Sequence, residues 1–231
     1  MFQVDRALLE ECRHTLGGDA RIRWVLGGSG SGKSAVCREI HSTLGVPVLD
    51  MDARIYGTFH ALFSPLRHPV SYAWSMAPDG LGWLLDMTPD EFDSFNRASL
   101  PEYLDLLAGE IRQIDDGSDL VIDGGVCNPT LLAEVIDPAR MVCMRRDGLD
   151  PRNLWAEPGE RLAMRDAVMR LDATGAKWSR FLEFDRGITS TLLAESSDAA
   201  VPVCGWDESE PVSAVATRVS ALLGLVSSPF T

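Results

Sequence analysis

The sequence predicts an α/β fold with a doubly wound, mostly parallel five-stranded sheet. Short apolar runs alternate with longer segments of helical periodicity, and two of these runs, 120–122 and 141–144, are apolar at every position. Continuous apolar runs are typical of parallel strands that are buried on both faces. Alternation of strands with helices indicates a sheet that is covered on both sides. We expect a single domain over residues 1–231, because α/β domains often reach this length.

The first quarter of the chain shows this alternation clearly. Apolar residues recur every four positions before a Gly-Gly pair, which predicts an amphipathic helix with a glycine stop. A run of β-forming residues then enters a glycine-rich stretch and a second helical segment. The predicted elements are a helix over 4–16, a strand over 21–26, a helix over 33–44 closed by Gly45, and a strand over 46–49.

The next segment, residues 53–116, reads as a helical insertion between two strands. Thr88 to Glu91 and Ser99 to Glu102 both have the capping-box pattern, in which a hydroxyl and a carboxylate three residues apart cap a helix start. We therefore expect two helices, one after each box. The remaining predicted elements are strands over 120–122, 141–144 and 201–204, helices over 158–171 and 176–196, and a last helix that includes Val212, Val215, Val219 and Leu222.

Net charge, cysteine content and hydrophobicity argue against several classes of partner and location. The formal net charge is −13, so most of the surface would repel a polyphosphate backbone, and we expect no nucleic-acid partner. The five cysteines stand singly, with no C-x-x-C pair, which fits reduced thiols. No apolar run is long enough to span a membrane, and the first residues lack the pattern of a signal peptide. These features predict a cytoplasmic protein with no membrane partner.

The segment from Gly27 to Ser34 carries the strongest functional signal. It fits G-x-x-x-x-G-K-[ST], the P-loop pattern, and it lies between a predicted strand and a predicted helix. Glycines let the backbone curl so that its N–H groups face phosphate oxygens. The alternative is a glycine-rich turn that matches by chance. The predicted ATP-binding residues are Gly28, Ser29, Gly30, Ser31, Gly32, Lys33 and Ser34, with Lys33 on the β- and γ-phosphates and Ser34 on Mg²⁺.

The stretch from Val25 to Tyr56 resembles the opening of the P-loop small-molecule kinases, and is similar to uridine kinase and gluconate kinase. The likeness lies in the GxSGSGKS loop and in an aspartate at the end of the second strand. It implies a kinase-like three-layer sandwich that transfers the γ-phosphoryl group of ATP to a hydroxyl of a nucleoside, a sugar or a related metabolite. It also implies a helical substrate-binding insertion and an arginine-rich lid. The uridine-kinase pattern has an aromatic pair after its aspartate, whereas Asp52 precedes Ala53-Arg54-Ile55-Tyr56. This departure leaves the acceptor open.

Three aspartates end predicted strands at the edge where ligands bind in open α/β sheets. Asp50 and Asp52 could bind the acceptor hydroxyl, take its proton and align its oxygen. Asp123 follows the run 120–122, where a P-loop protein places its Mg²⁺-binding acid. The alternative role for each is to cap a helix or a turn.

Arginines crowd the segment 145–171, which we predict to be the lid. Arg161 and Arg165 share one helix face, and lid arginines in kinases offset charge on the transferred phosphoryl group. Interspersed acids make an ion-paired surface the alternative. In the insertion, Arg54, Tyr56, His60 and Arg67 are candidate acceptor-binding residues beside Asp52, although each is more often a surface or core residue.

We therefore predict an ATP- and Mg²⁺-dependent kinase, either monomeric or homodimeric, with a small-molecule acceptor. Two alternatives stay open. One is a P-loop ATPase that acts as a switch or assembly factor with a protein partner, and the other is a nucleotide-binding protein without catalytic activity. The sequence favours the kinase because it contains paired aspartates and an arginine segment, and no distinctive residue that would position water.

Overall fold

The structure is a computed structural model that describes residues 1–114, 117–148, 151–157 and 159–225. Its centre is a five-stranded sheet in which every pairing is parallel, with the order β2-β3-β1-β4-β5. The predicted α/β class and parallel sheet are thus confirmed. The strands are β1 (Ile22–Gly27), β2 (Val48–Asp50), β3 (Leu120–Asp123), β4 (Met141–Arg146) and β5 (Val203–Trp206).

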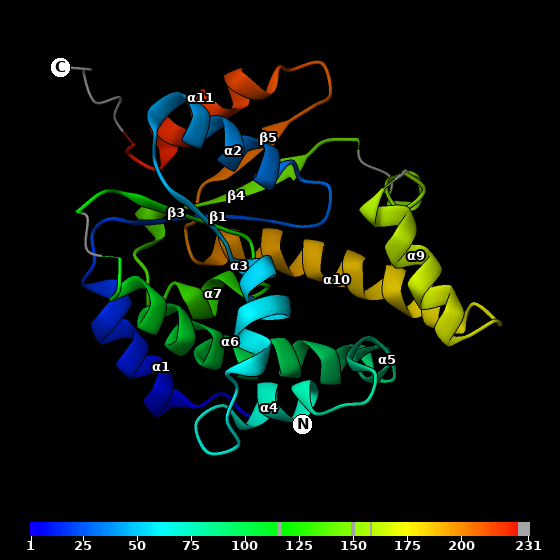
Figure 1. The fold of residues 1–231 in the computed structure, drawn as a ribbon. Helices are drawn as coiled ribbons and strands as arrows, with labels where there is room; N and C mark the ends of the chain where they lie inside the picture. The colour runs from blue at the N-terminus through cyan, green and yellow to red at the C-terminus, as the bar shows by residue number, and fades with distance from the viewer. Residues whose placement is uncertain (115–116, 149–150, 158, 226–231) are drawn as a thin grey trace.

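Helices cover both faces of the sheet, which gives three layers (Figure 1). One face carries α2 (Lys33–Leu44) and α11 (Val212–Leu222), which pack against each other. The other face carries α7 (Pro129–Leu132) and the long helix α10 (Ala176–Asp198), with α1 (Arg6–Cys12) and α6 (Pro89–Ile111) packed together beyond them.

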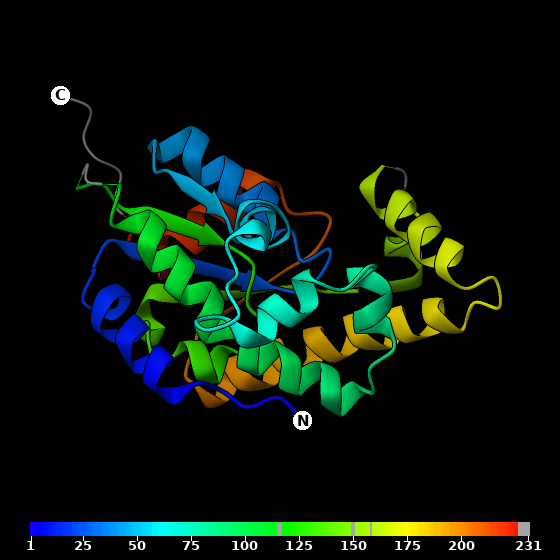
Figure 2. The same ribbon diagram turned by 60° about the horizontal axis from the view of Figure 1, so that its bottom comes forward.

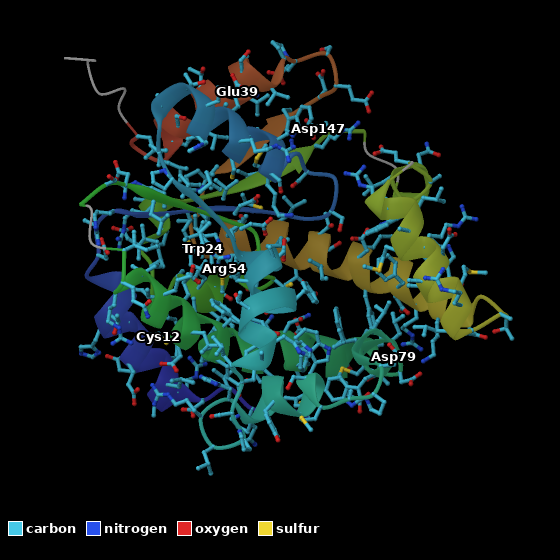
Figure 3. All side chains as sticks on the ribbon, viewed as in Figure 1. Cys12, Trp24, Glu39, Arg54, Asp79 and Asp147 are labelled. Carbon is cyan, nitrogen blue, oxygen red and sulfur yellow. The ribbon has the colours of Figure 1, made fainter. Side chains whose placement is uncertain are left out.

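The strands build these layers because their side chains alternate between two hydrophobic cores. Trp24 and Leu26 of β1 lie in the core shared with α6, α7 and α10, whereas Val25 lies in the core shared with α2 and α11. All three are fully buried. Trp24 lies below β1 in Figure 3, on the side of the sheet that faces α7 and α6.

The buried side chains of the insertion extend the core that contains Trp24 and Leu26. It begins with α3 (Met51–Ala53) and two irregular turns, η2 (Arg54–Thr58) and η3 (Phe59–Ala61). Two short helices follow, α4 (Pro69–Ser75) and α5 (Gly80–Leu85), and α4 packs against α6 (Figure 2). The last two residues of the predicted insertion, 115–116, lie outside the described part of the chain.

The prediction of two helices after residue 88 is wrong, because α6 is one helix of 23 residues that contains Pro101. Thr88 and Glu91 form the expected capping box at its start. At the second box, the Ser99 hydroxyl instead donates a hydrogen bond to the carbonyl of Asn96. Glu102 accepts hydrogen bonds from the backbone N–H groups of Val70 and Ser71, so it caps α4 instead of restarting α6.

The chain after β4 forms a helical arm. It comprises α8 (Pro151–Leu154), α9 (Glu160–Leu171) and the first turns of α10, and Figures 1 and 2 show α9 projecting away from the sheet. Residues 149–150 and 158 of the predicted lid lie outside the described residues. The smaller elements are η1 (Arg13–Gly17), which continues α1, and η4 (Pro138–Arg140), which precedes β4.

The strand order determines where a ligand can bind. The chain leaves β1 through α2 towards β2 on one side, and leaves β4 through the arm and α10 towards β5 on the other. The connections therefore diverge at the carboxyl ends of β1 and β4. In open α/β sheets such a divergence forms the ligand crevice, and the segment from Gly27 to Ser34 begins there.

Candidate functional site

The loop between β1 and α2 has the backbone shape of an anion cradle. Gly30 and Gly32 have φ angles of 73° and 85°, a region that favours glycine. Within the described residues, the backbone N–H groups of Ser29, Gly30 and Gly32 donate no hydrogen bond to another protein group. The 12-residue helix α2 starts at Lys33 and adds its unpaired N–H groups and its dipole. The predicted phosphate-binding segment is thus a curled loop with free donors.

Two neighbours from distant parts of the chain hold this loop in shape. The indole Nε1 of Trp206, the last residue of β5, donates a hydrogen bond of 2.7 Å to the carbonyl of Ser31. On the other side, α10 comes so close that a methyl group at position 28 would lie 2.3 Å from the hydroxyl of Thr189. Gly28 is therefore required where α10 meets the loop.

Ser34 and Asp123 meet at the start of α2, as expected for a Mg²⁺ site. Ser34, in the first turn of α2, lies beside the Asp123 carboxylate, and the Asp123 side chain is almost fully buried at the end of β3. Asp123 Oδ1 has no hydrogen-bond partner among the described residues. An orphaned buried carboxylate oxygen beside a hydroxyl fits a hard cation that takes its remaining ligands from phosphates and water. Burial raises the pKa of Asp123, and the Ser34 and Lys33 contacts oppose this rise.

No protein-only metal cluster occurs nearby, since the described residues contain no group of three or more His, Cys, Asp or Glu side chains that could hold an ion. A two-residue site matches Mg²⁺, which usually binds to one or two protein groups and to substrate phosphates.

Lys33 and Asp52 approach each other across the crevice, with 3.7 Å between Lys33 Nζ and Asp52 Oδ2. Lys33 is mostly buried, whereas about half of the Asp52 side chain remains exposed. Burial against the surrounding chain raises the pKa of Asp52, the Lys33 charge lowers it, and the Asp50 charge raises it again. The structure therefore brings the predicted phosphate-binding lysine and the predicted acceptor-side aspartate together.

A pair of glycines after β3 makes this approach possible, and sequence reasoning missed them. Gly124 and Gly125 have φ angles of 71° and 73°. A methyl group at position 124 would lie 2.6 Å from both Asp52 Oδ2 and Lys33 Cε. The backbone N–H of Gly125 lies near the Asp52 carboxylate and lowers its pKa. The signal was present in the sequence as Asp-Gly-Gly directly after a buried strand.

The turn at Gly124 is anchored to β1 through both of its backbone groups. Its N–H donates to the carbonyl of Val25 at 3.0 Å, and its carbonyl accepts a 2.9 Å hydrogen bond from the indole of Trp24. The buried Trp24 therefore helps to fix the floor of the site.

Asp50 has the capping role that was its alternative. Its Oδ1 accepts a 2.9 Å hydrogen bond from the N–H of Ala53 and so caps α3. Asp50 pairs in register with Asp123 across β2 and β3, which places three aspartates at one edge of the sheet.

The arginines of the insertion are bound to carboxylates. Arg54 Nε donates to both carboxylate oxygens of Glu110, at 2.9 and 3.0 Å (Figure 3 labels Arg54). Arg67 pairs with Asp105 at 2.8 Å and with Glu11 at 2.6 Å. Both predicted acceptor-binding arginines thus have structural partners.

Tyr56 and His60 lie together around one indole ring. The rings of Tyr56 and Trp74 meet edge to face with centroids 5.6 Å apart, and those of His60 and Trp74 are 5.0 Å apart. Tyr56 follows Asp52 by four residues and is 66% exposed, so it offers an open aromatic face beside the aspartate.

Arg161 and Arg165 lie on α9, apart from the curled loop (Figure 1). Arg161 forms an ion pair with Glu157, one turn away, and the Arg165 guanidinium lies 6.0 Å from the centroid of the Trp178 ring. The structure does not bring these two residues to Lys33.

A cavity of about 340 Å³ opens beside the curled loop, between β4, α8 and α10. Gly28, Ser29 and Ser31 form one wall, and Arg186 of α10 lines another. Arg186 is exposed and has no ion pair or hydrogen bond with another described residue. Sequence reasoning missed it because it follows the arginine-rich segment, although its place in a long helix after the predicted lid was a usable signal.

Comparison with known proteins adds no family assignment: no model of a known protein family matches this chain, and no curated protein matches it. In the part of the chain that the structure describes, none of the helices combines the length and the apolar character needed to cross a membrane. The five cysteines are free thiols.

Proposed function

We propose that this chain is an ATP-dependent phosphotransferase that moves the γ-phosphoryl group to a hydroxyl of a small molecule. The observation that carries the proposal is the contact between Lys33 and Asp52 at the mouth of the curled loop. It places a cation suited to the β- and γ-phosphates next to a carboxylate suited to an acceptor alcohol.

Different residues of the site bind the phosphates and the metal ion. The free N–H groups of Ser29, Gly30 and Gly32 bind phosphate oxygens, and Lys33 bridges the β- and γ-phosphates. Ser34 and Asp123 would hold Mg²⁺, which neutralises charge on those phosphates.

Asp52 acts on the acceptor. Its carboxylate accepts the hydrogen bond of the acceptor hydroxyl, aligns the oxygen with the γ-phosphorus and takes up the proton as the new P–O bond forms. Alignment is the larger contribution, because orientation that is fixed before reaction can supply about 7–11 kcal/mol of the barrier.

The arm that carries α9 is the proposed lid, and the insertion from residue 53 is the proposed acceptor-binding part. Arg186 is better placed than Arg161 or Arg165 to contact the terminal phosphate, because it lines the cavity beside Gly28 and forms no ion pair or hydrogen bond with the residues that the structure describes. Five free thiols favour the reducing cytoplasm as the location.

The test is a screen for stimulated turnover. We expect ADP release from Mg·ATP to rise when a suitable alcohol is added, and ³¹P NMR to show the matching phosphate ester. If the protein binds Mg·ATP but no alcohol raises ADP release or yields an ester, the kinase proposal is contradicted. The alternative of an ATPase switch would then be favoured.

A further inference from the structure

The acceptor side of the site has a distinct charge pattern. We define it by Asp52, Tyr56 and Cys127, which all keep part of their surface open to solvent. Cys127 follows the Gly124-Gly125 turn, and its thiol lies within the electrostatic reach of both Asp52 and Lys33. Asp52 is the charged member of this set.

The arginines of the neighbouring insertion are already bound to other protein groups. Arg54 is held by Glu110, Arg67 by Asp105 and Glu11, and Arg97 by Asp93 and Glu195. Residues 53–114 contain eight carboxylates and four arginines. The fourth, Arg112, donates to the carbonyl of Ala108 at the end of α6.

Two further cations, Lys33 and Arg186, lie on the side of the site that is proposed to bind the phosphates. Lys33 is required by the β- and γ-phosphates in the proposed reaction. Arg186 lines the separate cavity beside Gly28, and none of Asp52, Tyr56 and Cys127 lines that cavity. An anionic acceptor would therefore bring its charge next to Asp52, with no arginine of residues 53–114 left unpartnered to receive it, which is costly in a partly buried site.

The exposed aromatic face favours a different kind of group. Tyr56 is held by its edge-to-face contact with Trp74, so the ring is supported while most of its surface is open. A supported tyrosine beside a carboxylate suits apolar groups and cations, which gain from packing on the ring and from the negative charge.

We propose that the acceptor side takes an uncharged or positively charged alcohol with an apolar group, and excludes alcohols that carry a phosphate or a carboxylate. This inference rests on the proposed function for its meaning as a substrate class. Its physical content, a negative potential at the surface around Cys127, can be measured without turnover.

The experiment labels Cys127 with two methanethiosulfonate reagents of similar size, one with a trimethylammonium group and one with a sulfonate group. The other four cysteines are buried, so Cys127 should label first. Burial and the Asp52 charge raise the pKa of the Cys127 thiol to about 12, so the labelling is followed at mildly alkaline pH. The Cys127→Ser variant gives the background.

We expect the rate ratio of cationic to anionic reagent to exceed the ratio for a small free thiol by about tenfold, because fixed charge concentrates the opposite ion. The excess should shrink in Asp52→Asn. A ratio equal to or below that of the free thiol would overturn the inference, whatever the turnover screen shows. Turnover of a phosphorylated alcohol in preference to its unphosphorylated parent would also overturn it. Absence of all turnover with a high labelling ratio would instead count against the kinase proposal alone.

Discussion

The curled loop and the insertion form two sides of one crevice, but they relate to the sequence differently. At the loop, Lys33 and Ser34 at the start of α2 lie close to Asp123 at the end of β3. In the insertion, Arg54 and Arg67 are engaged by carboxylates instead of facing the site. Local backbone geometry determines the first group, and partners from distant segments determine the second.

This difference shows in which parts of a chain the residue type alone indicates the role of a residue. A glycine-rich turn between a strand and a helix defines its own shape, so its residues keep their roles in any fold that contains it. A surface arginine has a role only once its neighbours are known. The comparison makes Asp52 the residue that links the two sides, because it reaches Lys33 from the start of the insertion.

Removing the charge of Asp52 should have the largest effect on activity. We expect Asp52→Asn to lower kcat by about 10²–10⁴-fold, the usual contribution of a positioned general base. Affinity for Mg·ATP should stay within a few-fold, because the loop is untouched. Steady-state kinetics on the acceptor found in the screen, with calorimetry for nucleotide binding, checks both. Unchanged kcat would remove Asp52 from the mechanism and separate the two sides of the crevice.

Closing the space under Lys33 should have the next largest effect, on stability. Gly124→Ala adds a methyl group 2.6 Å from Asp52 and Lys33 at a φ of 71°, so we expect a loss of about 2–5 kcal/mol in the free energy of unfolding. Gly45→Ala is the matched control, because Gly45 has a φ of 72° and no atom within 4 Å of the added group. It should lose only about 1–2 kcal/mol. Equal losses in urea unfolding would show that the packing beneath Lys33 is looser than described.

An Arg67 variant tests whether this residue of the insertion stabilises the fold or binds the acceptor. Its guanidinium is about half exposed and bridges Asp105 and Glu11, so we expect Arg67→Ala to lose roughly 0.5–1 kcal/mol of stability with kcat and KM unchanged. Thermal unfolding and steady-state kinetics measure the two effects. A tenfold rise in the KM of the acceptor would contradict this expectation and show that Arg67 contributes to acceptor binding.

Asp50 should have the smallest effect, on pH dependence. Asparagine caps a helix as well as aspartate, so Asp50→Asn keeps α3 and removes one negative charge beside Asp52. The Asp50 charge helps to raise the pKa of Asp52, so its removal should lower that pKa and move the acidic limb of kcat/KM to lower pH. A limb that stays in place would mean that another group controls it. A large loss of kcat would give Asp50 a direct role.

Several features could be read from the sequence because their causes are local. The capping box at Thr88 and Glu91 lies within four residues. The apolar runs of β3 and β4 indicate strands that are buried on both faces. Gly45 ends α2 in the left-handed conformation that its type predicts.

Other features depend on contacts that no local pattern contains. The pattern from Ser99 to Glu102 predicted the start of a second helix, but Glu102 accepts a hydrogen bond from the N–H of Ser71 at the start of α4, 31 residues away, and α6 continues without a break. The partner of Arg54 lies 56 residues further along the chain. Gly124 could be recognised as a turn residue, whereas its contact with Lys33 and Asp52 required the fold.

The central claim is that the loop from Gly27 to Ser34 binds the phosphates of a nucleotide. Isothermal titration of the protein with Mg·ATP tests it most directly, with Lys33→Ala as the comparison. We predict saturable binding to one site. The Kd of the variant should be at least tenfold larger, because a charge-assisted hydrogen bond contributes about 1.5–3 kcal/mol. Absence of binding by the parent protein, or equal affinity of the two proteins, would contradict the account.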